Sequence, residues 1–256
     1  MQLTREQFEQ IAPLLPRQRG NVRLDNFDVV NAILFVTANG CKWRALPAHY
    51  GPWHTIYTRM SRWAKAGVLD RLFEHLQRKR LLRVRIEALS PDSTVVKVHP
   101  DGTGALKKGG PQAIGRSRGG WSTKLHLVAA TARDVLTWSL TPGQAGDAPE
   151  GRRLIAALGA SPVQARVALL MDSAYQDDAT RALAESRGFV AVVPPSPQRK
   201  QPWVLDRARY RRRNEVERLF RRLKAWRGVF TRYDKTDGMF AAFITVALIA
   251  EALRLR

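Results

Sequence analysis

The first third of the chain carries the hydrophobic periodicity of short helices. Between Asp25 and Gly40, apolar residues recur at helical spacing, Asp25 or Asn26 can cap the start, and Gly40 ends the pattern. The same criteria predict a helix over Arg5–Leu15, capped by Thr4 and stopped by Pro16. Two more helices are expected over 53–67 and 68–84. The N-terminal region is therefore expected to be all helical.

These short helices have two interpretations. Arg59, Arg62 and Lys65 place positive charge on the third helix, as in a helix-turn-helix-like DNA-binding module. An ordinary small bundle with a basic polar face fits the same pattern, and the sequence leaves both open.

From about residue 88 the hydrophobic period becomes that of strands. Strand patterns cover 92–98, 121–130, 135–141, 165–172 and 189–194, and helical patterns lie between them and after them. The segments 121–130 and 135–141 are expected to pair as a hairpin around a turn at 132–134. The order predicts an α/β domain with a mixed sheet and helices packed on it. We place the domain boundary at this change, giving a helical domain over 1–87 and a second domain over 88–256.

Charge narrows the choice of partner. The 256 residues include 43 Lys and Arg against 22 Asp and Glu, a formal net charge of +21, while 45% apolar residues indicate a globular chain. Such an excess predicts a polyanionic partner, with nucleic acid the first candidate. A generally adhesive or ribosome-associated basic protein is the alternative.

The cysteine count and the apolar stretches bear on location. The only cysteine, Cys41, excludes an intrachain disulfide or a cysteine-based zinc site and fits a reducing cytoplasm. The most apolar stretch, Met239–Ala250, is too short to span a bilayer and predicts a buried helix. We therefore expect a cytoplasmic protein without a membrane partner.

Two aspartates lie at predicted strand ends. Asp92 begins the strand 92–98, and Asp172 ends the strand 165–172. Ligand sites on open α/β sheets lie where strands end, so both are candidate catalytic acids. Each could instead cap the turn that follows.

A third acid lies in the basic helix predicted over 210–226. At helical spacing, Tyr210, Arg213 and Lys224 share one narrow stripe with Glu217, next to a buried face of Val216, Leu219, Phe220 and Leu223. Glu217 then lies at the core margin, either as an ordinary i, i+4 partner of Arg213 or as a third metal-holding carboxylate. Three carboxylates without a Cys or His set favour Mg²⁺ or Mn²⁺ over zinc.

The spacing Tyr210-(2)-Arg213-(3)-Glu217-(6)-Lys224 resembles the signature of bacterial insertion-sequence transposases of the DDE type, with insertion sequence family five as the closest resemblance. Several other stretches resemble such enzymes in the same order: "APLLP", "CKWRALPAHYGPWHTIYTRMSRWAKAG", "DSTVVKVHPDGTGALKKGGPQAIGRSRGGWSTKLHL", "GQAGDAPEG", "MDSAYQDD" and "RYDK". The resemblance therefore covers nearly the whole chain.

The resemblance implies a ribonuclease-H-like mixed sheet with flanking helices, preceded by a helix-turn-helix-like N-terminal domain that binds DNA ends. It implies that Asp92, Asp172 and Glu217 are the catalytic acids and hold Mg²⁺, with Mn²⁺ as a substitute. The implied reaction is two-metal phosphoryl transfer, which cleaves DNA at the element's ends and joins the 3′ ends to target DNA. The implied partners are double-stranded DNA, as terminal repeats and target, and further copies of the chain assembled on it.

Basic residues near these acids are candidate DNA contacts. Tyr210, Arg213 and Lys224 are expected to hold phosphates, and Arg116 and Arg118 to meet the DNA backbone from a glycine-rich loop at 107–120. Lys124 and His126, on one strand face, are expected either to line the DNA groove or simply to be solvated.

The sequence departs from the family pattern at Pro91, before Asp92, and at Gly146, before Asp147. Because proline cannot donate to a sheet ladder, we expect the strand to begin at Asp92. The alternatives to a transposase are an inactive relative acting as a DNA-binding protein or repressor, a metal nuclease that cuts without joining, and an RNA-binding accessory protein.

Overall fold

The computed structural model describes residues 2–18, 20, 23–81, 86–107, 112–161 and 166–255. The chain forms two compact units. The first comprises Met1–Arg80, Lys97–Gln112 and Arg222–Arg256, and the second comprises Leu81–Val96 and Ala113–Arg221. The sequence-based division into domains at 1–87 and 88–256 stays a prediction.

Helices and strands lie close to where the hydrophobic pattern predicts them. The helices are α1 (Arg5–Glu9), α2 (Asn26–Asn39), α3 (Trp53–Lys65), α4 (Val68–Leu81), α5 (Asp147–Ala157), α6 (Asp178–Ser186), α7 (Arg207–Tyr210), α8 (Asn214–Ala225), α9 (Arg227–Phe230) and α10 (Asp237–Ala252). The strands are β1 (Ala88–Val98), β2 (Gly115–Ser117), β3 (Gly120–Ala129), β4 (Val135–Pro142), β5 (Ala168–Leu170), β6 (Val190–Val192) and β7 (Thr231–Arg232). Short 3₁₀ helices occupy Ala12–Leu14, Trp43–Ala45, Ala48–Tyr50, Pro100–Lys107, Ser173–Tyr175 and Arg211–Arg213.

The first unit is mainly a bundle around α10. Helix α10 packs against α2, α3 and α9, and nearly all of its residues from Met239 to Glu251 are buried. This confirms the prediction of a buried C-terminal helix. Among the helices of the described residues, none is long and apolar enough to cross a membrane.

The first predicted helix is too long. Thr4 caps α1 as expected, through a capping box with Gln7, but α1 ends at Glu9 and a 3₁₀ turn follows at Ala12–Leu14. Pro13 explains the difference, because its ring lacks an N–H and clashes with the preceding turn of an α-helix. The expected cap at Asp25 and the left-handed end at Gly40, with φ of 60°, are both confirmed for α2.

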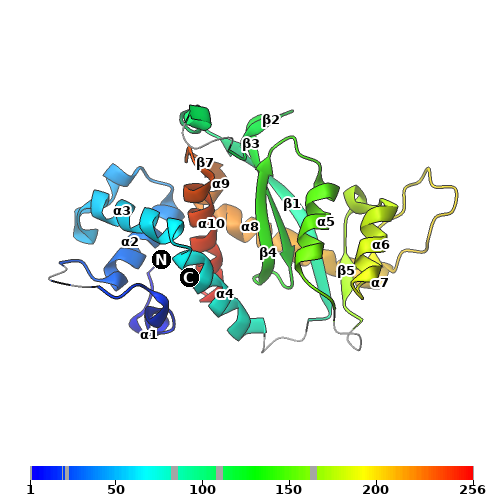
Figure 1. The fold of residues 1–256 in the computed structure, drawn as a ribbon, viewed down its shortest axis with the longest axis horizontal. Coiled ribbons are helices and arrows are strands. Elements are labelled where there is room, and N and C mark those ends of the chain that lie inside the picture. Colours follow the sequence, from blue (N-terminus) through cyan, green and yellow to red (C-terminus); the bar gives the residue numbers. More distant parts are fainter. Residues whose placement is uncertain are drawn as a thin grey trace. The chain divides into compact units, whose positions relative to one another are not determined.

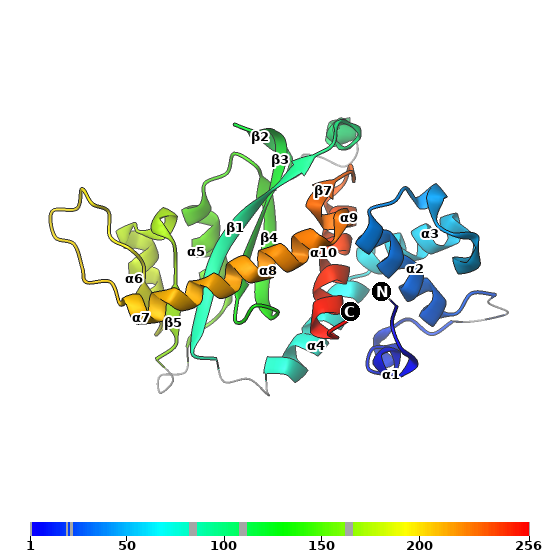
Figure 2. The same cartoon turned by 180° about the vertical axis from the view of Figure 1, so that it is seen from behind.

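The second unit is a mixed sheet covered on both faces. Strands β3 and β4 form the predicted antiparallel hairpin, β1, β5 and β6 run parallel, and β2 pairs with β3. Figures 1 and 2 show α5 on one face of the sheet and α8 crossing the opposite face. The predicted architecture is confirmed: a mixed sheet with flanking helices, in a chain whose N-terminal region is helical.

Two local expectations for this sheet are wrong. Strand β1 begins at Ala88 and runs through Pro91. Its registered pairs with β5 are at Ala88 and Leu89, so the N–H that Pro91 lacks is not needed for either pair. Within the predicted glycine-rich loop, Gly115–Ser117 forms β2, since its backbone pairs with Gly120–Ser122. Residues 108–111 of that loop lie outside the described residues.

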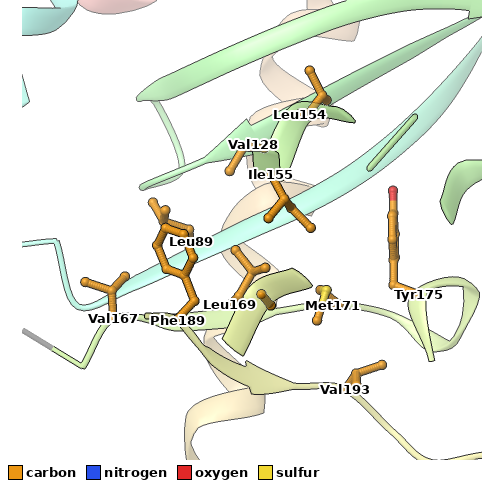
Figure 3. Packing of buried hydrophobic residues seen from close by; sticks show 11 residues of the cluster. Leu89, Val128, Leu154, Ile155, Val167, Leu169, Met171, Tyr175, Phe189 and Val193 are labelled. Atoms are coloured by element: carbon orange, nitrogen blue, oxygen red, sulfur yellow. The ribbon is translucent and has the colours of Figure 1, made fainter. Parts of the chain in front are cut away.

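Apolar side chains between the sheet and α5 form the core beneath the strand ends (Figure 3). Leu89 and Leu169 from β1 and β5 meet Leu154 and Ile155 from α5, and Tyr175 is packed into the same cluster. On the other face, Ala88, Ala168 and Leu170 pack with Tyr210. Successive side chains of β1 and β5 point to opposite faces of the sheet, so one set packs against α5 and the other set lies on the opposite face with Tyr210.

Gly151 tests the packing of α5. A methyl group at this position would overlap the Tyr175 ring, whereas Gly238 in the first turn of α10 has open space around it. Alanine normally stabilises a helix relative to glycine, so Gly238→Ala should be neutral or raise the free energy of unfolding by up to about 1 kcal/mol. Gly151→Ala should lower it by roughly 1–3 kcal/mol through overpacking. Urea unfolding followed by circular dichroism measures both, and equal effects would contradict the close α5–Tyr175 packing.

Candidate active site

Asp92 lies within β1, and Asp172 lies two residues beyond the end of β5, the parallel neighbour of β1. Leu89 of β1 pairs with Leu169 of β5, and each acid follows its leucine by three residues (92 − 89 = 3 and 172 − 169 = 3). Asp92 accepts a hydrogen bond of 2.7 Å from the Ser93 N–H. Asp172 caps the 3₁₀ helix Ser173–Tyr175, accepting from the Ala174 N–H at 2.9 Å, so the capping alternative is observed for this residue. Capping occupies one carboxylate oxygen and leaves further lone pairs available.

Arg213 bridges the two acids Asp92 and Glu217. Its Nη1 donates to Asp92 Oδ2 at 3.0 Å, and its Nη2 donates to Glu217 Oε1 at 2.6 Å. One guanidinium therefore lies between a strand acid and a helix acid that are far apart in sequence. The i, i+4 pair that was the alternative reading of Glu217 does form, but the same arginine also reaches Asp92. The predicted buried face of α8, with Val216, Leu219, Phe220 and Leu223, is confirmed.

Asp92 is the most strongly perturbed of these carboxyl groups. Burial raises its pKa from 3.8 to about 6, and the negative charges of Asp172 and Asp147 add to the increase. The Ser93 N–H and the Arg213 charge act in the opposite direction without cancelling it. Asp92 is thus a carboxylate whose negative charge the protein alone only partly compensates.

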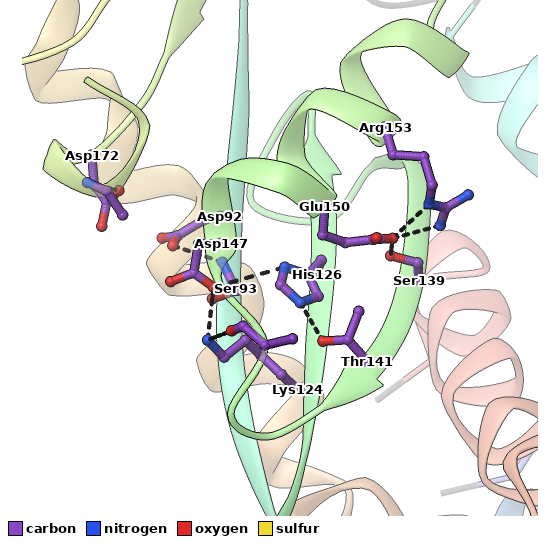
Figure 4. A network of polar contacts seen from close by, with 12 residues as sticks. Asp92, Ser93, Lys124, His126, Ser139, Thr141, Asp147, Glu150, Arg153 and Asp172 are labelled. Carbon is purple, nitrogen blue, oxygen red and sulfur yellow. Dashed lines mark hydrogen bonds and ion pairs between the residues drawn. The ribbon is translucent and has the colours of Figure 1, made fainter. Parts of the chain in front are cut away.

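A fourth acid, Asp147, lies in the same network, and the sequence analysis did not assign it a role. Its Oδ1 accepts hydrogen bonds from Ser93 Oγ at 2.7 Å and from Lys124 Nζ at 3.0 Å (Figure 4). It is the first residue of α5, immediately after Gly146. The one hint of Asp147 in the sequence was the departure from the family pattern at Gly146. The spacing along the chain gave no reason to expect a contact between Asp147 and Ser93.

The structure separates the candidate DNA contacts into two kinds. Arg116 and Arg118 are exposed at the β2–β3 hairpin, next to the exposed Trp121. His126 is fully buried, and the Lys124 side chain is only 12% exposed and donates to the Ala145 carbonyl at 2.6 Å. Lys124 also donates to Asp147, so little of either side chain is open to a phosphate, and their contact with DNA stays a prediction.

The three residues of the basic helix signature also differ in their surroundings. Tyr210 is partly buried, and burial raises the pKa of its hydroxyl. Arg213 is committed to Asp92 and Glu217. Lys224, in the last turn of α8, is half-buried, and desolvation lowers the pKa of its ammonium. Their assignment to phosphates stays a prediction.

The donor set fits a divalent cation in kind. In the described part of the chain, no three His, Cys, Asp or Glu side chains lie close enough to hold an ion as they stand. However, Asp92 and Glu217 already share one cationic group, and Asp92 and Asp172 interact electrostatically. Carboxylate oxygens suit Mg²⁺ and Mn²⁺, and a metal would have to replace the guanidinium between the two acids.

Arg213 should matter for stability far more than its neighbour. The Arg213–Asp92 pair is 19% and 15% exposed, whereas the Arg212–Glu87 pair is 44% and 53% exposed. Arg213→Gln leaves the buried Asp92 without its cation, so we expect a loss of roughly 2–4 kcal/mol in metal-free urea unfolding at pH 7. Arg212→Gln should cost at most about 1 kcal/mol. Similar losses for both variants would show that Arg213 does not neutralise a desolvated acid.

The raised pKa of Asp92 predicts a pH dependence of stability. The pKa of Asp92 is about 6 in the folded chain and 3.8 ordinarily, so the folded chain binds this proton more tightly than the unfolded chain does. The resulting stabilisation is complete below pH 3.8 and is lost as pH rises through about 6. Asp92→Asn removes the titration, so its advantage over wild type should grow between pH 4 and 7 by about 1–3 kcal/mol. Urea unfolding in EDTA measures this difference. Asp178→Asn is the control, and a difference for Asp92→Asn that is flat with pH would contradict the prediction.

Comparisons with known proteins identify the family of this chain. A family model described as "Transposase DDE domain" matches residues 85–251, and one described as "Putative transposase of IS4/5 family" matches residues 3–73. A "Putative transposase for insertion sequence element IS6501" from Brucella ovis is 32% identical over 128 residues, covering 49% of this chain and 94% of the relative. The "Uncharacterized protein y4sN" of Sinorhizobium fredii is 32% identical over 109 residues, covering 41% and 84%.

Solved structures give more distant matches. The Mos1 transposase paired-end complex with left transposon end is 12% identical, covers 82% of this chain and 80% of that chain, and has a TM-score of 0.29. The catalytic domain of Mos1 mariner transposase is 13% identical, covers 66% and 90%, and has the same TM-score of 0.29. The two family matches together span most of the chain, and the protein belongs to the IS4/5 family of DDE transposases.

Proposed function

We propose that this chain is an active transposase that cleaves DNA at the ends of an insertion sequence and joins the 3′ ends to target DNA. The observation that carries the proposal is the Arg213 guanidinium shared by Asp92 and Glu217, with the negative charge of Asp172 acting on Asp92. Phosphoryl transfer between DNA strands needs acids that can hold divalent cations at the reacting phosphate.

In this proposal Asp92, Asp172 and Glu217 hold Mg²⁺, for which Mn²⁺ substitutes. Bound divalent ions supply charge neutralisation and lower the pKa of an attacking hydroxyl group. The protein supplies acids from regular elements, since Asp92 lies within β1, Asp172 caps the 3₁₀ helix Ser173–Tyr175 just after β5, and Glu217 lies in α8. A metal also removes the cost of ionising the desolvated Asp92, which the protein alone leaves partly uncompensated.

Arg213 has two successive partners in this scheme. Without metal it neutralises Asp92 and Glu217. Cations held by these acids would repel its guanidinium, which would then be available for a DNA phosphate. Tyr210 lies near the same guanidinium, with the Arg213 Cζ 5.9 Å from its ring centroid. We therefore expect Tyr210 to contact the same phosphate as Arg213.

The proposed DNA interface includes the basic hairpin of the second unit. Arg116 and Arg118 are exposed around the β2–β3 turn, and the exposed Trp121 pairs across the strands with Arg116. Exposed arginines beside an aromatic ring suit phosphates and an unpaired base. Lys224 on α8 is a further proposed phosphate contact. Lys124 and His126 remain proposed contacts, although Lys124 is bonded to Asp147 and His126 is buried. Double-stranded element ends, target DNA and further copies of the chain are the proposed partners.

A second candidate is an inactive relative that binds DNA without cutting it. The Arg213 bridge favours it in one respect, because an internal cation already satisfies Asp92 and Glu217. The two candidates differ in divalent-dependent cleavage alone, since both use the same basic surfaces.

Glu217→Gln and Glu215→Gln form a matched pair for this test, because both change an acid in the first turns of α8 and only Glu217 contacts Arg213. Each protein is incubated with supercoiled plasmid carrying the element's ends, in Mg²⁺, Mn²⁺ or EDTA. We expect nicking at the ends and strand transfer with wild type and Glu215→Gln in metal only. Glu217→Gln should lose at least about 100-fold in rate while still binding DNA. If wild type binds the ends but never cuts in either metal, the active-enzyme proposal fails and the inactive relative is left.

A further inference from the structure

Asp147 is held by more groups than an acid at a helix start requires. An aspartate at this position commonly interacts with the helix dipole alone. Here its Oδ1 accepts from Ser93 Oγ of β1 at 2.7 Å and from Lys124 Nζ of β3 at 3.0 Å. Side chains from two strands thus hold one carboxylate oxygen in place.

The supporting groups are themselves buried. The Lys124 side chain is 12% exposed, so its ion pair with Asp147 lies in a largely dry setting. Below it, His126 is fully buried, and its Nε2 lies 2.8 Å from Thr141 Oγ1. Its Nδ1 has no hydrogen-bond partner among the described residues and lies 3.9 Å from Asp147 Oδ1, too far for a hydrogen bond. Burial lowers the pKa of His126, so this contact is not an ion pair at neutral pH.

This network connects directly to Asp92. Ser93, which donates its hydroxyl to Asp147, also donates its backbone N–H to the Asp92 carboxylate at 2.7 Å. Figure 4 shows the second oxygen of Asp147 turned away from Lys124, toward the side where Asp92 and Asp172 lie. A negative charge at that place acts on any cation bound by Asp92.

We propose that Asp147 is a positioning residue of the catalytic centre: it orients Asp92 through Ser93 and adds a fourth negative charge that strengthens cation binding. Lys124 partly neutralises that charge and so limits the affinity. The proposal rests on the proposed function, because it concerns cations held by Asp92, Asp172 and Glu217. The proposal therefore predicts that removing the charge of Asp147 and removing the charge of Lys124 change the cation affinity in opposite directions.

Mn²⁺ affinity of the full chain without DNA, measured by isothermal titration calorimetry, separates this role from a structural one. Asp147→Asn retains an oxygen that accepts from Ser93 and Lys124 but removes the charge, and should weaken Mn²⁺ binding by about tenfold or more. Lys124→Gln releases the charge of Asp147 and should tighten binding by about threefold or more. Asp178→Asn changes the first residue of α6 in the same way and should leave affinity within about twofold of wild type.

A purely structural role predicts a different result. It would weaken binding in both Asp147→Asn and Lys124→Gln, or change neither, and either outcome overturns the proposal. Urea unfolding checks that each variant is folded, and if Asp147→Asn does not fold, the direction of the Lys124→Gln effect still decides. If wild type itself binds no Mn²⁺, the proposed function fails together with this inference. If wild type binds Mn²⁺ and Glu217→Gln loses it while Asp147→Asn does not, only this inference fails.

Discussion

The candidate site depends on the contact of one guanidinium with two carboxylates. Arg213 joins Asp92, in the middle of the sheet, to Glu217, in the helix that crosses the sheet's opposite face. Without a positive group between them, the two acids would repel each other and Asp92 would be buried with an uncompensated charge. The metal-free fold therefore uses an arginine where the proposed reaction uses metal ions.

This arrangement explains how a chain of net charge +21 keeps acids at its centre. Positive charge on the surface suits DNA, but a catalytic site for phosphoryl transfer needs negative charge to collect cations. Burial separates the two requirements, since desolvation and the neighbouring acids raise the pKa of Asp92 despite the basic surroundings. Arg213 contacts Asp92 directly, and Lys124 contacts Asp147 directly.

The apolar core gives this electrostatic arrangement its rigidity. Leu89 and Leu169 are paired in the register of β1 against β5, and each lies three residues before one of the two aspartates, Asp92 and Asp172. On the same face, α5 packs over Leu89 and Leu169 through Leu154 and Ile155, and its first residue is Asp147. Small shifts in α5 would therefore move a charge near Asp92, which is why the fit of Gly151 against Tyr175 bears on the site as well as on stability.

Much of this could be predicted from local sequence. Periodicity located α2, α8, α10 and the β3–β4 hairpin, and the apolar run that ends at Asp172 placed that acid just beyond β5, whereas Asp92 lies inside β1 and not at its start. Helical spacing put Glu217 beside Arg213 at the core margin. These predictions hold because period, caps and strand ends depend on residues close together in the chain. Local rules were less reliable where they conflicted, as at Pro13, which ends the first helix early, and Pro91, which β1 accommodates.

The tertiary structure alone decided which of these residues meet. Arg213 reaching Asp92, Ser93 and Lys124 sharing Asp147, and His126 lying buried beneath them all join residues from different strands and helices. Sequence spacing carries no information about such contacts, because they follow from strand order and register across the sheet. The sequence by itself determined the family, the elements and the three candidate acids. Only the tertiary structure shows that Asp92 and Glu217 share Arg213 and that Asp147 is linked to Asp92 through Ser93. Packing is what brings charged groups so distant in sequence into contact.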